Sequence, residues 1–158
     1  MRTFIINWYG AYTFEEIEYH PDFGNGIYLI TGKQKYQRDS EIQYCGITKD
    51  SFYNRIKTHH KKDFIFKEQK FWLGKFLYPK IFDRSDLETA EKIIIYFWQP
   101  KLNERKRIAP PTPTTILNFW FKKDGTSRLN QLAIYRDLAD VISWDEVNWR
   151  TGNLQVQV

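Results

Sequence analysis

The sequence predicts an α/β (α+β) protein with a small mixed three-stranded sheet flanked by helices, an N-terminal extension and a C-terminal accessory lobe. Two runs of strand-forming residues, Gly26–Thr31 and Glu41–Ile47, lie on either side of a polar connection and predict an antiparallel hairpin. The segment Lys70–Tyr78 predicts a third strand. Helical periodicity and capping residues between and after these strands predict the flanking helices. A chain of 158 residues fits one domain of this kind.

The first 25 residues predict only a short extension before this core. Phe4–Trp8 is typical of a strand, and the following residues 13–19 predict a helical turn or two. Thr13 and Glu16 have the spacing of a capping box, in which each side chain bonds the other residue's backbone. A turn-forming run, HPDFGNG, then leads into the strand that begins at Gly26.

The first core helix is expected to run from Asp50 or Ser51 to about Lys62. At 100° per residue, Phe52 lies at the centre of its apolar stripe, and Arg55 and His59 lie together on one flank. His60 falls on the other flank. A histidine beside an apolar stripe is usually a packed, hydrogen-bonded residue, so this pattern alone leaves a structural and a catalytic His59 open.

The second core helix contains a carboxylate where an apolar residue is expected. Ser85 and Glu88 have capping-box spacing, and the helix is expected to run to about Trp98, before Pro100. Glu91 lies inside the apolar stripe of this helix. An ionised carboxylate on a buried face is costly unless it is paired or binds a cation. Glu91 is therefore expected either to form a structural ion pair or to hold a metal ion.

The C-terminal segment, residues 104–158, is expected to form an accessory segment of a hairpin plus a helix. A proline-rich break, IAPPTPTT, precedes a predicted hairpin over residues 116–129 with a Lys-Asp-Gly turn. Residues 130–142 predict a helix, and residues 143–158 an extended tail. The aromatic and basic side chains of the hairpin could contact a bound partner, or the hairpin could simply cap the core.

The charge and composition restrict the possible partners. The net charge is +5, and residues 26–103 carry fifteen basic and nine acidic side chains. A polyanion is therefore expected to bind there, although a basic surface can also be only a solvated face. Cys45 is the only cysteine, which excludes an internal disulfide and a cysteine-rich zinc module and favours a reducing, cytoplasmic location. No apolar run reaches membrane-spanning length, and the first residues lack a signal-peptide core, so no membrane partner is expected.

Several of these residues together resemble the signature of the GIY-YIG nuclease family. The triplet GIY stands at Gly26–Tyr28, and the second triplet at Tyr44–Gly46 has Cys45 in place of the usual aliphatic residue. Arg55 and His59 have the family's Arg-x-x-x-His spacing. Glu91 stands twelve residues before Asn103, as in the family's glutamate helix and closing asparagine. The resemblance covers residues 26–103, about half of the chain.

The resemblance implies a metal-dependent endonuclease that hydrolyses DNA phosphodiester bonds. The implied catalytic residues are Tyr28, Tyr44, Arg55, His59, Glu91 and Asn103. Glu91 would hold one divalent cation, Mg²⁺ or Mn²⁺, since a two-metal site needs several acidic ligands. By the same resemblance Tyr28 would accept a proton from the attacking water, Arg55 would brace the phosphate, and Asn103 would orient Glu91 or its water.

Basic side chains around this centre are the expected contacts to the DNA backbone, although lysine-rich runs are often only solvated surface. They are Lys57, Lys61, Lys62, Lys101, Arg105, Lys106 and Arg107. Two other functions stay open at this point. The same fold could bind nucleic acid without cutting it, or the aromatic residues could form a protein interface.

Overall fold

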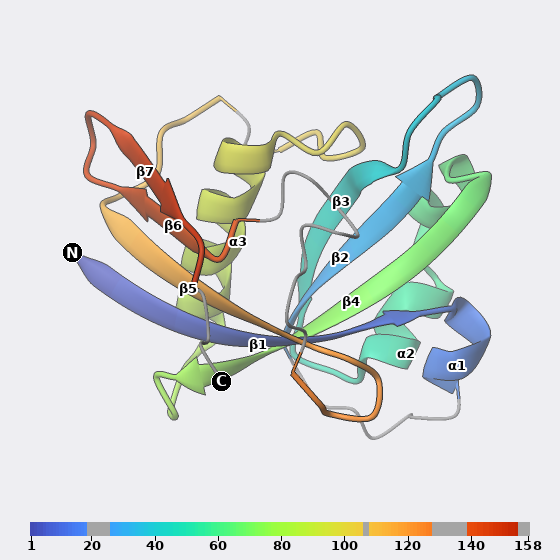
Figure 1. Cartoon of the computed structure of the whole chain (residues 1–158), viewed down its shortest axis with the longest axis horizontal. Coiled ribbons are helices and arrows are strands. Elements are labelled where there is room, and N and C mark those ends of the chain that lie inside the picture. Colours follow the sequence, from blue (N-terminus) through green and yellow to red (C-terminus); the bar gives the residue numbers. More distant parts are fainter. Residues whose placement is uncertain (19–25, 106–107, 128–138, 155–158) are drawn as a thin grey trace.

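The chain folds around one curled, mixed sheet of seven strands (Figure 1). The computed structural model describes residues 1–18, 26–105, 108–127 and 139–154. The strand order is β3-β2-β4-β1-β5-β6-β7, in which β1 and β5 are parallel and all other neighbours are antiparallel. The strands are β1 (Arg2–Tyr12), β2 (Gly26–Lys33), β3 (Glu41–Thr48), β4 (Lys67–Tyr78), β5 (Thr114–Phe121), β6 (Val141–Trp144) and β7 (Trp149–Gly152).

Three short α-helices and one 3₁₀ turn cover the two faces of the sheet. The helix α3 (Arg84–Trp98) lies inside the curl, between the arm that contains β3 and the arm that contains β6 (Figure 1). The helices α1 (Phe14–Glu18) and α2 (Phe52–Lys57) lie on the opposite face. The 3₁₀ turn η1 (His60–Phe64) follows α2. Among the described helices, none is both long and apolar enough to cross a membrane.

Strand β1 lies in the middle of the sheet, and one of its faces is wholly apolar. Phe4, Ile6 and Trp8 alternate along it and are almost completely buried with the inner face of α3. Such period-two burial is what one covered face of a sheet requires. The indole nitrogen of Trp8 donates a hydrogen bond to the side-chain oxygen of Asn118 at 2.7 Å, which joins β1 to β5. Both partners of this bond are buried, so it also satisfies two polar groups in the core.

The predicted fold class is therefore wrong. The sheet is seven-stranded rather than small and three-stranded, and the segments before residue 26 and after residue 103 contribute strands to it instead of forming an extension and an accessory lobe. The reason lies in the parallel pairing of β1 with β5, which are separated by about two thirds of the chain. Parallel neighbours need a long connection, so nothing in the local sequence indicates that these two strands meet.

Several individual elements agree with the sequence. The β2–β3 hairpin is confirmed, and Tyr28 pairs with Gly46 in its register. The capping box of Thr13 and Glu16 is present: each residue's backbone nitrogen donates to the other's side chain. The end of α3 at Trp98 is also confirmed.

Other element boundaries differ from expectation. The helix α2 ends at Lys57 instead of near residue 62, and His59 has an extended backbone before η1 begins. The capping box of α3 is formed by Asp83 and Asp86, not by Ser85 and Glu88. Most of the predicted C-terminal helix, residues 130–138 of 130–142, lies outside the described residues, and its last two residues belong to β6.

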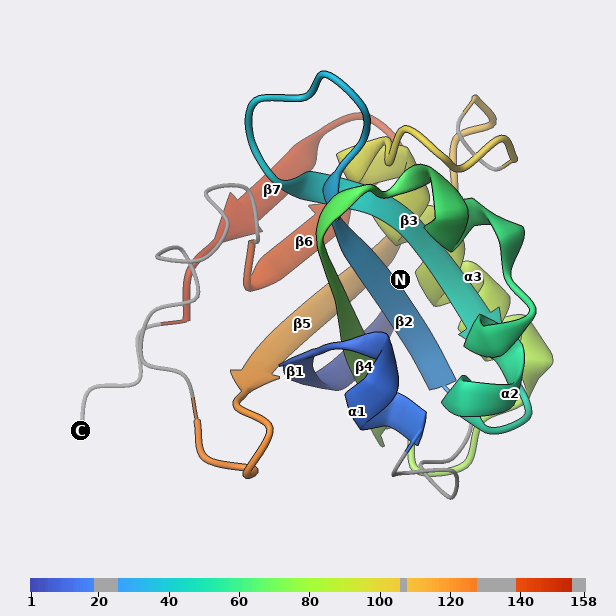
Figure 2. The same ribbon diagram turned by 90° about the vertical axis from the view of Figure 1, so that its right-hand side faces the viewer.

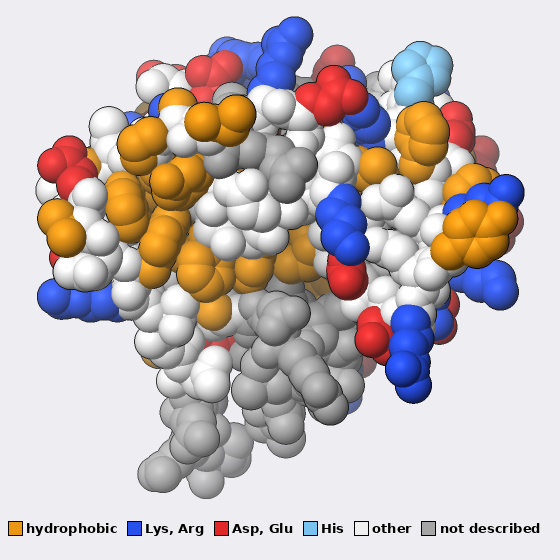
Figure 3. Space-filling model, turned by 90° about the horizontal axis from the view of Figure 1, so that it is seen from above, with side chains coloured by type: hydrophobic (Ala, Val, Ile, Leu, Met, Phe, Trp, Pro, Cys, Tyr) orange, Lys and Arg blue, Asp and Glu red, His pale blue; other side chains and the backbone are white. Residues whose placement is uncertain are grey.

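The C-terminal residues after 138 form a β6–β7 hairpin that packs on the C-terminal half of α3. Trp144 and Trp149 face each other with ring centroids 4.7 Å apart, and Tyr96 contacts both rings. Seen from above, hydrophobic side chains gather over this end of the molecule (Figure 3). This aromatic packing attaches the hairpin to α3 and closes one end of the inner core.

Candidate active site

A cleft of about 770 Å³ opens along the outer edge of β3. The strand β3 ends one side of the sheet, and α2 and α3 reach its edge from opposite faces (Figure 2). The loop after α3, residues 99–105, lies along the same edge and supplies further lining residues. Six of the residues expected at the active site or at the DNA backbone line this cleft: Tyr44, Arg55, Lys61, Glu91, Asn103 and Arg105.

Glu91 is the buried carboxylate of the cleft. It is 9% exposed and stands among the buried residues Ala90, Ile94 and Ile95 of α3, as the helical pattern predicts. Its side chain nevertheless lines the cleft, as does that of Arg55 of α2. Arg55 is exposed at the end of a short helix, so its guanidinium can reach a bound anion. A carboxylate and a guanidinium therefore face the same cavity from two different helices.

Tyr28 lies behind the wall of the cleft instead of in it. Its side chain is fully buried on β2, and its hydroxyl has no hydrogen-bond partner among the described residues. The hydroxyl presses against the α-carbon of Gly46, which does line the cleft; a β-carbon on Gly46 would collide with it. Burial raises the pKa of Tyr28 well above its usual range, with further contributions from Tyr44. The second glycine of the motif thus allows the Tyr28 hydroxyl to reach the cleft wall.

Tyr44 is the phenol that lines the cleft directly. It is half-buried on β3 and its ring lies 6.1 Å from the Tyr28 ring. Burial and the charge of Glu91 raise the pKa of Tyr44, and Arg55 acts in the opposite direction. The pKa of Tyr44 therefore depends on both charged groups of the cleft, which shift it in opposite directions.

His59 packs behind Tyr44, with ring centroids 4.5 Å apart. Its Nδ1 accepts the backbone N–H of Lys61 at 3.2 Å, which leaves the proton of the neutral ring on Nε2. Burial, followed by the positive charges of Arg55 and Lys61, lowers the pKa of His59 to about 4. The imidazole is therefore neutral at pH 7, and it is a hydrogen-bond donor at Nε2.

The two adjacent histidines differ in burial as expected, but for another reason. His59 is 7% exposed and His60 lies on the surface. The helical bearings assumed a continuous helix, whereas His59 caps η1 from an extended backbone after α2 has ended. A chain that leaves its helix and turns back toward β3 directs His59 inward and His60 outward.

Asn103 holds the loop after α3 against the edge of β3. Its amide nitrogen donates to the carbonyl of Cys45 and its amide oxygen accepts the N–H of Cys45, both at 2.9 Å. The backbone N–H of Leu102 adds a bond to the carbonyl of Gln43 at 2.9 Å. The side chain of Asn103 thus pairs with the strand as another backbone would. This contact places Asn103 at the cleft, where it positions the loop after α3.

The expected DNA contacts are divided between the cleft and the surrounding surface. Lys61 and Arg105 line the cleft, and Lys61 pairs with Glu104 at 2.8 Å. Lys62 pairs with Asp63, and its ammonium also lies over the Phe14 ring, away from the cleft lining.

Two further lysines lie on the surface beside the cleft. Lys101 pairs with Glu41 at 3.0 Å, and Lys57 lies over the Tyr53 ring. Residues 106 and 107, which are the predicted contacts Lys106 and Arg107, lie outside the described residues.

The cleft also contains residues that the sequence did not single out for this role. Glu88 and Arg84 of α3 line it and form an ion pair at 3.0 Å. Glu88 stands three residues before Glu91, on the same side of the helix, and this spacing is a signal that could have identified it. Its assignment to a capping box concealed that signal. Lys49 and Asp50, in the turn after β3, line the cleft as well.

The donor set fits a cation that has one or two protein ligands. Within the described ranges there is no cluster of three histidine, cysteine, aspartate or glutamate side chains that could hold a metal ion. Glu91 supplies one carboxylate at the cleft, and a hydrated Mg²⁺ or Mn²⁺ ordinarily accepts one or two carboxylates together with water and substrate oxygens. The residues are thus compatible with a hydrated ion that is completed by a bound phosphate.

Comparisons with known proteins identify no relative of this chain: no family model, no curated protein and no solved structure matches it. The function is therefore inferred from the cleft itself.

Proposed function

We propose that the chain is a metal-dependent DNA endonuclease of the GIY-YIG type, which hydrolyses phosphodiester bonds in the cleft along β3. The observation that supports this most strongly is the placement of Glu91. It is a buried carboxylate on an apolar helix face, and it lines a cleft that Arg55 lines as well. A buried carboxylate is stable where it is paired or binds a cation, and a cation beside a phosphate fits this position at the cleft.

The buried hydroxyl of Tyr28 gives independent support. A buried hydroxyl without a partner costs about 1–3 kcal/mol relative to one that is bonded. A phenylalanine would fill the same space in β2 without that cost. The sequence has a tyrosine there, with its hydroxyl at the cleft wall formed by Gly46. Unsatisfied polar groups of this kind are typical of sites that store strain or perform chemistry.

In the proposed reaction Arg55 and the cations beside it bind the phosphate and stabilise the charge that develops on it. Arg55, Lys61 and Arg105 all line the cleft, and an arginine can contact two phosphate oxygens at once. A Mg²⁺ or Mn²⁺ ion held by Glu91 would supply additional positive charge at the phosphate. The role of the protein is to fix the phosphate between these groups.

Proton transfer is assigned to the two tyrosines, with Tyr44 nearer to the substrate. Burial raises the pKa of both phenols, so a bound cation would have to stabilise the phenolate before either could accept a proton at neutral pH. Tyr44 lines the cleft and can exchange a proton with water there. Tyr28 lies directly behind Gly46, and its ring lies near both Tyr44 and His59. The neutral His59 supports Tyr44 from behind as a positioning residue.

A second function, nucleic-acid binding without cleavage, uses the same cations. The observation that favours it is the high pKa of Tyr28 and Tyr44, which opposes their action as bases in the unliganded protein. We propose DNA as the partner in either case. The single cysteine agrees with the cytoplasmic location that we also propose.

The test is incubation of the purified protein with supercoiled plasmid, with Mg²⁺ or with a chelator. We expect nicked or linear plasmid only with Mg²⁺ or Mn²⁺, and intact plasmid with the chelator. Retention of plasmid on a gel, without any nicking over a range of Mg²⁺ and Mn²⁺ concentrations, would establish the binding module instead.

A further inference from the structure

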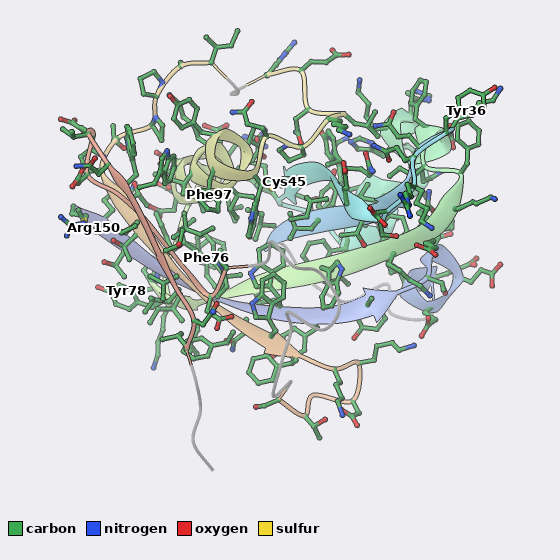
Figure 4. All side chains as sticks on the ribbon, turned by 45° about the horizontal axis from the view of Figure 1, so that its top comes forward. Tyr36, Cys45, Phe76, Tyr78, Phe97 and Arg150 are labelled. Atoms are coloured by element: carbon green, nitrogen blue, oxygen red, sulfur yellow. The ribbon has the colours of Figure 1, made fainter. Side chains whose placement is uncertain are left out.

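The connection between β2 and β3, residues 33–40, projects beyond the end of the sheet on the same strand that forms the cleft. Tyr36 stands at its outer end, with its side chain directed away from the body of the molecule (Figure 4). The ring is 93% exposed, and the ammonium of Lys35 lies 5.2 Å from its centroid. This connection, here called the tip hairpin, contributes none of the residues that line the cleft.

The tip hairpin is held in one shape by three glutamines. Gln43, fully buried on β3, donates to the carbonyl of Gly32 at 2.8 Å and to the side chain of Gln37 at 2.7 Å. Gln34 bonds the same two glutamine side chains, at 2.7 and 2.8 Å. A buried polar network of this kind fixes the loop that it supports.

Within this rigid turn Tyr36 has a φ of 69°, a left-handed conformation that is unfavourable for a bulky residue. The hydrogen bonds of the three glutamines thus hold the backbone of Tyr36 in this strained conformation, with its ring exposed to solvent. Strain that is maintained at a surface position points to a contact made there.

The tip hairpin carries two exposed cations, Lys35 and Arg38, and one exposed carboxylate, Asp39, so it is positively charged overall. Lys35 and Arg38 are exposed, and neither forms an ion pair with any residue in the described ranges. Lys33 and Lys101, which lie nearer to the sheet, are neutralised by Glu68 and Glu41. The unneutralised cations are thus those next to Tyr36, a residue whose hydroxyl can donate to a phosphate.

We propose that the tip hairpin is a second contact to the DNA backbone, at least half a helical turn from the bond in the cleft. A strand rises about 3.3 Å per residue, so the five residues from Gly46 to Glu41 span about 17 Å, which is half of the about 34 Å turn of B-DNA. The tip hairpin lies beyond Glu41 and is therefore at least this far from the cleft. A duplex that lies along the edge of β3, with a phosphate in the cleft, then brings its backbone to Tyr36, Lys35 and Arg38.

This inference rests on the proposed binding of DNA in the cleft but not on cleavage, and duplex length tests it. The measurement is the affinity of the wild type, Lys35→Ala/Arg38→Ala and Tyr36→Ala for duplexes of about 24 and about 4 base pairs, the shorter one covalently linked at one end so that it stays double-stranded. The shorter duplex can fill the cleft but cannot reach the tip hairpin. The control is Lys122→Ala, an exposed lysine in the turn that follows β5 on the other arm of the sheet.

We expect the double variant to bind the long duplex about tenfold more weakly at about 100 mM salt, with a salt dependence flatter by about two units. We expect Tyr36→Ala to bind the long duplex about fivefold more weakly than the wild type does, and Lys122→Ala to bind it as tightly as the wild type does. All variants are expected to bind the short duplex as the wild type does. Equal losses on both duplexes, or no loss on the long one, would overturn the proposal.

The same experiment separates this proposal from the proposed cleavage activity. Length-dependent binding through the tip hairpin, without plasmid nicking, refutes the nuclease but retains the second contact. Nicking without any effect of the tip-hairpin variants retains the nuclease and refutes the second contact. If neither duplex binds at any salt concentration, both proposals are wrong.

Discussion

At the scale of single residues, Tyr28 and Gly46 are two sides of one contact and are expected to respond differently to mutation. Tyr28→Phe removes a buried hydroxyl that has no partner in the described structure. We expect its free energy of unfolding to stay equal to that of the wild type or to rise by about 1 kcal/mol, because an unsatisfied group is lost. DNA cleavage is expected to fall by about 10²-fold.

Gly46→Ala is the matched change on the other side of the contact. Its new β-carbon would meet the Tyr28 ring and hydroxyl, so we expect a loss of about 2 kcal/mol as well as a loss of cleavage. Urea denaturation and plasmid nicking measure both quantities. If Tyr28→Phe were clearly destabilised and still cleaved DNA, Tyr28 would be an ordinary core residue.

The pKa of His59 leads to a prediction on stability and pH. Its folded-state value, about 4, lies below the value of about 6.5 in an unfolded chain, so the unfolded state binds the proton more tightly between these two values. The neutral imidazole therefore stabilises the fold at pH 7, and this contribution is lost as the pH falls toward 4. Between pH 7 and pH 4.5, we expect the free energy of unfolding of His59→Asn to fall by about 2 kcal/mol less than that of the wild type.

His60→Asn is the control for this measurement, since His60 is exposed at the adjacent position. Urea denaturation at the two pH values is expected to give it the pH dependence of the wild type. Asparagine at position 59 can still accept the N–H of Lys61, so the cap of η1 is kept. The same pH dependence in the wild type and His59→Asn would show that His59 is not the group that titrates.

At the scale of elements, the residues that cap the start of α3 differ from those that the sequence predicts. The sequence predicts a capping box of Ser85 with Glu88, whereas the structure forms one of Asp83 with Asp86. The carboxylate of Asp83 accepts the N–H of Asp86 at 3.0 Å, and Asp86 bonds the backbone of Asp83 in return. We expect Asp83→Ala to lower the free energy of unfolding by about 1 kcal/mol and Ser85→Ala to change it by less than about 0.5 kcal/mol. If Ser85→Ala were more destabilised than Asp83→Ala in thermal or urea denaturation, Ser85 would be the cap of α3, as the sequence predicts.

Most elements could be predicted from the sequence because their signals are local. The β2–β3 hairpin, α3 and the buried Glu91 follow from periodicity within one segment. The end of α2 could not be placed, since Thr58 and His59 carry no strong stop signal and the turn η1 depends on packing against β3. The role of Asn103 is also non-local: its partner is the backbone of Cys45, which lies 58 residues away. No spacing rule indicates such a pair.

At the scale of the whole molecule, β1 is expected to be essential for folding. Its residues Phe4, Ile6 and Trp8 are buried between α3 and the rest of the sheet, and β1 separates β4 from β5 in the strand order. Deleting residues 1–12 would expose this core and leave two separate edges. We therefore expect the shortened chain to lack a cooperative thermal transition by circular dichroism. A folded, cleaving chain without these residues would mean that they form only an extension.

Non-local pairing also explains why the architecture differs from the one expected. The family resemblance covers only residues 26–103, and the strands that complete the sheet come from both sides of that region. Alternating burial in β1 and β5 is visible in each strand, but their partnership depends on chain topology. The residues that line the cleft come from the covered region, except for Glu104 and Arg105, whereas strands from outside that region complete the sheet around it.

The central claim is that Glu91 performs chemistry in the cleft, and the comparison of Glu91→Gln with the wild type tests it most directly. Glutamine has nearly the same shape but is a much weaker ligand for a hard cation. The measurement is single-turnover cleavage of saturating DNA in Mg²⁺, together with DNA affinity and unfolding, with Glu88→Gln as the control from the same helix. We predict that Glu91→Gln cleaves about 10²-fold more slowly or worse, with unchanged affinity and folding, and that Glu88→Gln stays within about threefold of the wild type. Cleavage by Glu91→Gln at nearly the wild-type rate, or a loss of stability in place of a loss of activity, would contradict the account.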